Sequence, residues 1–245
     1  MRIMKYKDAV VMGEKAAIYA ADSINRAIAE QGSARVVFST GQSQFTFLNA
    51  LRNQAVDWSQ VTMFHLDEYI GISEEHPASF VRYLKERFTY GLPLARIRFI
   101  NGMADTGEEI ASLNAEISES PIDVAFIGIG ENGHIAFNDP PADFETKTPY
   151  FVVNLNDTCK RQQVREGWFS TIEDVPKQAI SMSPRHIMAS KVIISVVPYK
   201  VKADAIQKML HSPLDCRIPC TILKEHPDCT LFLDDDSGAG IKVAV

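Results

Sequence analysis

The chain has 245 residues, of which 46% are hydrophobic and 23% charged, and its formal net charge is -6 at pH 7. This length and composition predict one α/β domain covering residues 1–245, and the mildly acidic balance argues against a nucleic-acid or anionic-membrane partner. We expect neither a signal peptide nor a membrane span, since no stretch approaches the roughly 18 uninterrupted apolar residues that a span needs. Four cysteines, Cys159, Cys216, Cys220 and Cys229, lack the paired spacing of a metal site, so we expect free thiols and a cytoplasmic protein.

Short apolar runs rich in β-branched residues recur along the chain and predict strands. They lie at residues 34–39, 61–66, 97–100, 122–129, 150–155, 191–197 and 229–233. Patterns typical of helices lie between them, at residues 13–30, 43–53, 78–88 and 201–211. Most of the strands are apolar on both faces, as strands covered on both sides are. The alternation therefore predicts a mostly parallel sheet with right-handed crossovers.

Polar residues gather in four loops that follow predicted strands, where parallel sheets bind their ligands. The first loop, "STGQSQ", opens a predicted helix and offers unpaired backbone N–H groups, which suits a phosphate. Its candidate ligands are Ser39, Thr40, Gly41, Gln42 and Ser43. The alternative is an ordinary helix cap at Ser43, and the Gly-Lys pair of a P-loop is missing.

The second loop, "HLDEYIG" at residues 65–71, places Asp67 and Glu68 directly after an apolar strand. Adjacent residues near a strand end point in different directions, so one carboxylate can face a cleft while the other makes a structural contact. A carboxylate at a dry strand end has a raised pKa, which suits a general base. A solvated turn is the alternative interpretation.

The third loop, "GIGENGHIAFNDP" at residues 128–140, leaves its strand through three glycines that permit a tight turn. His134 follows, with Asn132 and Asp139 nearby, and a histidine in such a loop is a candidate for proton transfer. Lone histidines are more often structural, so both interpretations stay open. The glycine order also matches a dinucleotide fingerprint, although "NDPP" prevents a helix from clearly opening after it.

The fourth loop, "VVPYKVKADAI" at residues 196–206, places Lys200 at the start of a helix that follows a strand. A lysine there can hold its ammonium group over an anion bound at the helix end. A solvated surface lysine is the alternative.

Five stretches together resemble the glucosamine-6-phosphate deaminase (isomerase) family, in that family's order and over nearly the whole chain. They are "STGQSQ", "HLDEYIGISEEHPASF", "GIGENGHIAFNDP", "VPKQAISM" and "SVVPYKVKADAI", of which the second and third are the most specific. The resemblance implies a modified doubly wound, mostly parallel α/β sheet with helices on both faces. The same fold is expected for the related 6-phosphogluconolactonases and ribose-5-phosphate isomerases.

The resemblance also implies an aldose–ketose isomerisation coupled to loss of ammonia, with no metal and no organic cofactor. An amino-sugar 6-phosphate and water would become fructose 6-phosphate, or its epimer, and ammonia. Asp67 would move a proton between C2 and C1, and His134 would shuttle a proton at the ring oxygen or O1. Asp139 would orient the imidazole, while Lys200 and the Gly41–Ser43 turn would hold the phosphate.

Several positions depart from the pattern that the resemblance implies. Asn132 stands where several members of the family carry aspartate, and Asp139 stands where glutamate is usual. Pro149 replaces an arginine expected in the allosteric site, so we expect no activation by N-acetylglucosamine 6-phosphate. The family places an arginine from a mobile lid on the phosphate, for which Arg165 is our first choice and Arg161 the second.

Two other functions are weighed against the deaminase. A 6-phosphogluconolactonase would hydrolyse a lactone, but its histidine motif typically continues differently from "IAFNDP". A sugar-phosphate sensor without catalysis would accompany a DNA-binding segment, and no basic helix-turn-helix pattern is found at either end. The C4 configuration of the sugar, and the choice between a monomer and a homo-oligomer, stay open.

Overall fold

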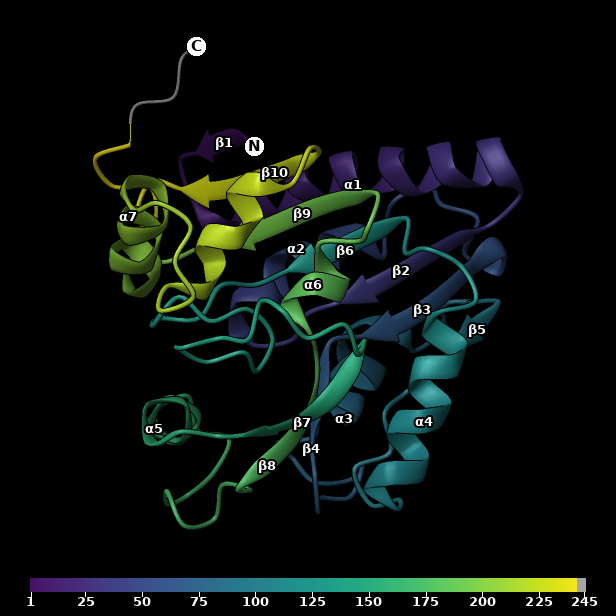
Figure 1. Ribbon diagram of the computed structural model, residues 1–245. Coiled ribbons are helices and arrows are strands. Elements are labelled where there is room, and N and C mark those ends of the chain that lie inside the picture. Colours follow the sequence, from purple (N-terminus) through teal and green to yellow (C-terminus); the bar gives the residue numbers. More distant parts are fainter. Residues whose placement is uncertain (242–245) are drawn as a thin grey trace.

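Two β-sheets of different size form the framework of the protein, which a computed structural model describes over residues 1–241 (Figure 1). The larger sheet has seven strands in the order β1-β10-β9-β6-β2-β3-β5, and its neighbouring strands run parallel. These strands are β1 (Arg2–Tyr6), β2 (Ala34–Phe38), β3 (Val61–His65), β5 (Arg96–Ile97), β6 (Val124–Ile127), β9 (Val192–Val197) and β10 (Cys229–Asp234). The smaller sheet is antiparallel in the order β4-β8-β7, with β4 (Asp67–Tyr69), β7 (Tyr150–Asn154) and β8 (Gln178–Met182).

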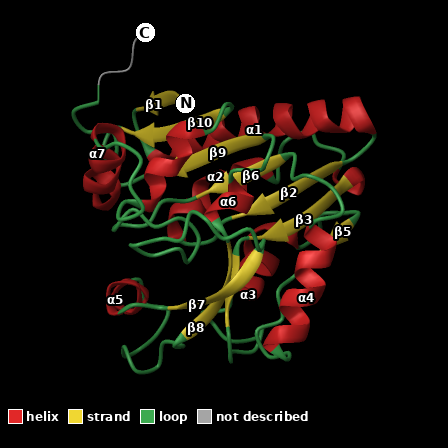
Figure 2. Ribbon diagram, in the orientation of Figure 1, coloured by secondary structure: helices red, strands yellow, loops and turns green. Residues whose placement is uncertain are grey.

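Helices pack around the larger sheet (Figure 2). The α-helices are α1 (Ala9–Gln31), α2 (Phe45–Leu51), α3 (Phe80–Leu84), α4 (Thr106–Ile117), α5 (Asp157–Arg165), α6 (Pro184–Ile187) and α7 (Ala203–His211). Short 3-10 helices are η1 (Gln42–Gln44), η2 (Trp58–Gln60), η4 (Lys200–Lys202) and η5 (Pro219–Glu225), and η3 (Lys85–Thr89) continues α3 as a π-helical turn. Across residues 1–241, none of the helices combines the length and the apolar character needed to cross a lipid bilayer.

Alternate residues of the central strand β2 enter two different hydrophobic cores. Val36 and Phe38 pack in the same core as residues of α1 and α2, whereas Val37 packs in the core that contains residues of α4 and α7. Successive side chains of a strand point to opposite faces, so this pattern means that both faces are covered. The expectation of a mostly parallel α/β sheet with helices on both faces is confirmed.

The predicted strands form close to their expected places, with two differences. The run at 97–100 contributes only the two-residue strand β5. The run at 150–155 forms β7, but β7 belongs to the small antiparallel sheet, where its outer residues stay partly exposed. β1, β4 and β8 were not expected: β1 and β4 lie at sheet edges and β4 has only three residues, whereas β8 is a buried central strand that the sequence analysis missed.

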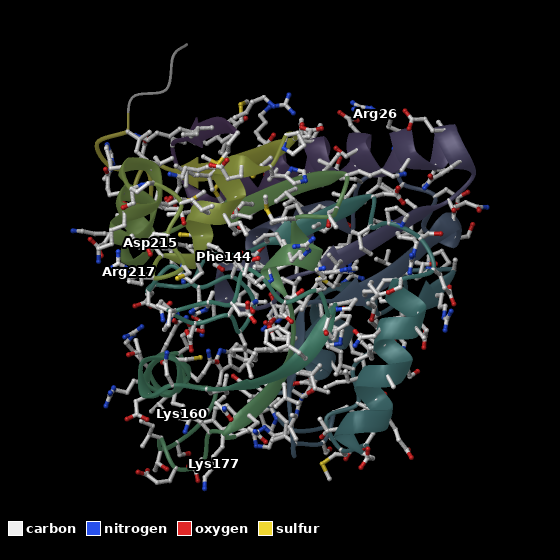
Figure 3. All side chains as sticks on the ribbon, in the orientation of Figure 1. Arg26, Phe144, Lys160, Lys177, Asp215 and Arg217 are labelled. Atoms are coloured by element: carbon white, nitrogen blue, oxygen red, sulfur yellow. The ribbon has the colours of Figure 1, made fainter. Side chains whose placement is uncertain are left out.

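The carboxyl ends of β2, β6 and β9 lie side by side, because these strands are neighbours in the sheet and run parallel. The side-chain amide of Gln44 joins two of them by donating to the carbonyl of Val196 (3.0 Å). The small sheet and α5 lie beyond this edge (Figure 1), and Figure 3 shows Lys160 and Lys177 at the outer end of that part of the molecule. The fold therefore brings the four polar loops to one edge.

Candidate functional site

A pocket of about 300 Å³ opens at this edge and receives residues from all four loops. The turn at residues 39–43 lines it together with Asp67 and His134. Several residues between 162 and 168, in and after α5, line it as well, as do residues of the 199–202 segment. The candidate acid–base residues and the candidate phosphate turn therefore share one cavity.

The turn from Ser39 to Ser43 is held in a conformation that leaves polar groups available. Gly41 has a φ of 104°, a backbone conformation that favours glycine. A β-carbon added there would meet nothing within 4 Å, so lack of space is not the reason for a glycine at this position. The hydroxyl of Tyr83 donates to the carbonyl of Gly41 (2.8 Å) and fixes the turn. The hydroxyl of Ser39 is buried and has no hydrogen-bond partner among residues 1–241, so it can serve a ligand.

Asp67 presents a nearly buried carboxylate to the pocket. Its side chain accepts no hydrogen bond from the part of the chain that the structure describes, and the residue is 6% exposed. Burial, with a smaller effect from the charge of Glu68, raises the pKa of Asp67 well above its ordinary value. A carboxylate in this environment is a stronger base than one in water, as proton abstraction from carbon requires.

Glu68 points away from Asp67 and has a structural role. Its carboxylate accepts hydrogen bonds from the hydroxyl of Ser79 (2.7 Å), the backbone N–H of Val81 (2.9 Å) and its own neighbour Tyr69 (2.8 Å). These contacts tie β4 to the start of α3. Burial raises the pKa of Glu68 against the opposing effect of these bonds. The two adjacent carboxylates thus divide as the sequence predicts, one toward the cavity and one into the structure.

Asn132 and Asp139 hold one nitrogen of the His134 ring. Asn132 Oδ1 lies 2.7 Å from His134 Nδ1 and 3.1 Å from the backbone nitrogen of His134. Asn132 Nδ2 donates to Asp139 Oδ1 (3.0 Å), which lies 3.3 Å from His134 Nδ1. We assign the ring proton to Nδ1 because two oxygen acceptors face it, which leaves Nε2 for a substrate.

The charge of Asp139 is maintained by these contacts. Burial would raise the pKa of Asp139, but the hydrogen bonds from His134 and Asn132 outweigh burial and lower the pKa. Asp139 is therefore ionised at neutral pH and stabilises a protonated imidazole.

Close packing against His134 explains one glycine of this loop. A β-carbon on Gly130 would lie 2.1 Å from Cε1 of the His134 ring, so the ring occupies the space that a side chain would need. The nearby residues form an isolated bridge between Ile135 and Asn138 and open no helix. The glycines therefore build the histidine site, and the dinucleotide interpretation is not supported.

The placement of Lys200 is corrected by the structure. Lys200 is exposed and lies outside the pocket, whereas Lys202 is 6% exposed and lines it. The two lysines sit on the 3-10 helical turn η4, where residues two apart point in different directions. Burial lowers the pKa of Lys202, and the charges of Glu166 and Glu131 oppose that effect. No ion pair joins Lys202 to residues 1–241.

Arg165, and not Arg161, lines the pocket. Arg165 forms an ion pair with Glu131, which connects the end of α5 to the loop that carries His134. Arg161 is exposed and pairs with Asp157 one turn away on the same helix (3.9 Å). The end of α5 is also tied to the phosphate turn, because Gln42 Nε2 donates to the carbonyl of Glu166 (2.9 Å).

Several pocket residues were not found from the sequence. They are Lys202, Gln162, Gln163, Glu166, Trp168 and Tyr199. The α5 stretch "DTCKRQQVR" is mostly polar, so no apolar stripe marks which of its residues face inward. The only indication in the sequence was the pair of adjacent glutamines, Gln162 and Gln163, in a segment expected to cover the ligand. Among residues 1–241, no cluster of three or more His, Cys, Asp or Glu side chains is arranged to hold a metal ion.

Comparison with known proteins relates the chain to one family. The family model described as glucosamine-6-phosphate isomerases/6-phosphogluconolactonase matches residues 7–232. A glucosamine-6-phosphate deaminase of Streptococcus pyogenes serotype M49 is 34% identical over 236 residues, which is 96% of this chain and 97% of the relative. A protein of the same name from Oenococcus oeni is 34% identical over 86% of this chain and 88% of its own length.

Solved structures agree with these relatives. A monomeric glucosamine-6-phosphate deaminase matches with a TM-score of 0.89 and 29% identity, over 98% of this chain and 99% of that chain. A 6-phosphogluconolactonase from Trypanosoma brucei matches with a TM-score of 0.82 over 98% of each chain, but at 12% identity, so it shares the fold alone. The chain belongs to the family of glucosamine-6-phosphate isomerases and 6-phosphogluconolactonases.

Proposed function

We propose that the chain is a glucosamine-6-phosphate deaminase, which converts the amino-sugar phosphate and water into fructose 6-phosphate and ammonia. The observation that carries the proposal is the single pocket that Asp67 and His134 share with the turn at 39–43 and with Lys202. Curated relatives that cover nearly the whole chain have this name and support it.

The phosphate of the substrate binds at one end of the pocket. The hydroxyl of Ser39 and the backbone N–H groups of residues 40–43 donate hydrogen bonds to it, and Lys202 supplies the positive charge that the dianion needs. Arg165 joins them by exchanging Glu131 for the phosphate. Because the phosphate does not react, its binding energy serves to position C1 and C2 of the sugar.

His134 opens the sugar ring. Its Nε2 removes the proton from O1 as the bond from C1 to the ring oxygen breaks, and it returns a proton to that oxygen. The acceptors Asn132 and Asp139 keep the proton on Nδ1 and stabilise the imidazolium that forms between the two transfers. Ring opening exposes the aldehyde, which makes the proton on C2 acidic.

Asp67 then moves the proton from C2 to C1 through an enol-type intermediate. O1 gains a proton as the amino nitrogen on C2 gives one up, so the product is a ketose with an imine in place of the C2 carbonyl, and addition of water to this imine releases ammonia. The raised pKa of Asp67 favours removing a proton from carbon. A single carboxylate on the rigid strand β4 can serve both carbons, since they are adjacent in the sugar.

The two alternative functions explain fewer features of the pocket. The solved 6-phosphogluconolactonase structures match at identities between 12% and 19%, compared with 29% for the solved glucosamine-6-phosphate deaminase. Lactone hydrolysis also has no carbon-bound proton to move, which is the step that suits Asp67. A non-catalytic sensor has no need of a buried carboxylate without hydrogen bonds, because such a group costs stability.

The proposal is tested with the purified protein and three substrates. We expect release of ammonia and formation of the ketose 6-phosphate from glucosamine 6-phosphate or its galactosamine epimer, assayed side by side. Hydrolysis of 6-phosphogluconolactone without ammonia release would support the lactonase, and binding without turnover would support the sensor. We also expect no activation by N-acetylglucosamine 6-phosphate, so a strong response to that sugar would contradict this part.

We further propose that the protein is monomeric and cytoplasmic. The structural relative at 29% identity is described as monomeric, which supports the first point. The four cysteines are all unpaired, which supports a reducing compartment. Light scattering after size-exclusion chromatography tests the monomer against a homo-oligomer.

A further inference from the structure

Gln163 on α5 is a buried polar residue for which the proton transfers described above have no use. It is 6% exposed and lines the pocket. Its side-chain amide makes no hydrogen bond with any of residues 1–241, although the helix that carries it is well packed through Cys159. Its amide atoms are not fully enclosed by the protein and the residue lines the pocket, so a bound ligand can pair with them.

The neighbouring residue Gln162 lines the same pocket, but its amide nitrogen is bonded within the protein. Its Nε2 donates to Glu166 Oε1 (2.7 Å), and the other oxygen of Glu166 accepts from the indole of Trp168 (3.1 Å). The backbone carbonyl of Glu166 is in turn held by Gln42 of the phosphate turn (2.9 Å). This network fixes the end of α5 relative to the phosphate site and thereby sets the position of Gln163.

The polar side chains that have been given a role in the reaction act at the two ends of the substrate. Ser39 and Lys202 meet the phosphate at C6, and Asp67 and His134 meet C1 and C2. The hydroxyl groups at C3 and C4 lie between these ends and have no protein partner so far. A carboxamide offers both a donor and an acceptor, which is what a sugar hydroxyl group needs.

We propose that Gln163 is a specificity-determining residue that hydrogen-bonds a non-reacting hydroxyl, at C3 or C4, of the amino-sugar phosphate. This inference rests on the proposed deaminase function. A pocket built to pair with a hydroxyl group rejects an analogue that lacks it, because the bound analogue shields the amide from water without pairing with it. Gln163 thus recognises the hydroxyl groups at C3 or C4, which the reacting residues do not contact.

The test is a cycle of two variants and three ligands. Dissociation constants are measured by calorimetry in an Asp67→Asn background, which binds the sugar without consuming it, for glucosamine 6-phosphate and its 3-deoxy and 4-deoxy analogues. We expect Gln163→Met to weaken binding of glucosamine 6-phosphate about 10-fold while leaving one of the two deoxy analogues within about 2-fold. Equal weakening of all three ligands, or none, would overturn the proposal.

Gln162→Met is the matched control, since it removes the same amide one residue away on the same helix. We expect it to change the affinity of all three ligands by one common factor, because Gln162 holds Glu166 and not the sugar. If Gln163→Met does not fold, Gln163→Asn withdraws the amide by one methylene and gives the same comparison. Ammonia release by the unmodified protein is measured separately, so loss of the deaminase proposal is distinguished from loss of the Gln163 contact.

Discussion

The wall of the pocket and the positions next to it along the chain contain the same kinds of side chain in different environments. Asp67 and Lys202 face the cavity without ion pairs, whereas their neighbours Glu68 and Lys200 are hydrogen-bonded in the structure or exposed to solvent. Binding groups must be left unsatisfied until a ligand arrives, and this costs stability. Glu68 makes compensating contacts of this kind, whereas Lys200 lies in solvent, so one member of each pair faces the cavity and the other does not.

The largest effect is expected for Asp67→Asn, which keeps the size of the side chain but removes the base. We expect kcat to fall at least about 1000-fold with little change in affinity for the phosphate, because general base catalysis contributes on this scale. The measurements are ammonia release and exchange of the C2 proton with deuterated water. Near-normal exchange would remove Asp67 from its assigned role.

The lysine pair gives the next comparison. Lys202→Ala is expected to lower kcat/KM about 100-fold, mainly through KM, because a buried ammonium would lose its contact with a charged phosphate. Lys200→Ala, two residues away and exposed, serves as the control and should change kcat/KM less than about 2-fold. The reverse ranking would return the phosphate role to Lys200.

Glu68→Gln probes the structural side of β4. Glutamine offers one acceptor oxygen where three donors converge, so we expect the free energy of unfolding to fall by about 2 kcal/mol. For a chain of this size that loss lowers Tm by roughly 4–8 °C. Thermal unfolding followed by circular dichroism measures it, and an unchanged Tm would mean that the Ser79 and Val81 contacts contribute nothing.

The smallest effect is a gain of stability in Asp67→Asn that grows with pH. The pKa of Asp67 is raised in the folded protein, so its favourable contribution is complete below its ordinary value of 3.8 and is lost as pH rises through the raised value. We therefore expect equal Tm values near pH 4 and a Tm about 2–4 °C higher for the variant near pH 8. A constant difference across this range would contradict the raised pKa.

Much of the site could be predicted from the sequence, because the loops that follow parallel strands must meet at one edge of the sheet. The turn at 39–43, Asp67 and His134 could be identified from that rule and from their local motifs. The small sheet could not be predicted, since its strand "DEY" is too short to show a periodic pattern. This strand also pairs with residues more than 110 positions away along the chain, such as Asp67 with Ser181. Its existence depends on tertiary contacts and not on local preference.

The choice between neighbouring residues was also beyond the sequence. Lys200 and Lys202 have the same chemistry, and only the 3-10 geometry of η4 decides which one is buried. Gln163 differs from Gln162 by one position on a polar helix, where no hydrophobic pattern indicates the inward face. Side-chain direction on short or polar elements therefore had to come from the three-dimensional structure.

Gly130 has a consequence for inherited variation at this site. The imidazole of His134 stands where even a methyl group on that residue would be placed. A single-nucleotide change from glycine to alanine would therefore displace the ring from its two acceptors and act like deletion of the histidine itself. We therefore expect substitutions of Gly130 to be eliminated by selection as strictly as those of the acid–base residues, although Gly130 has no side chain of its own.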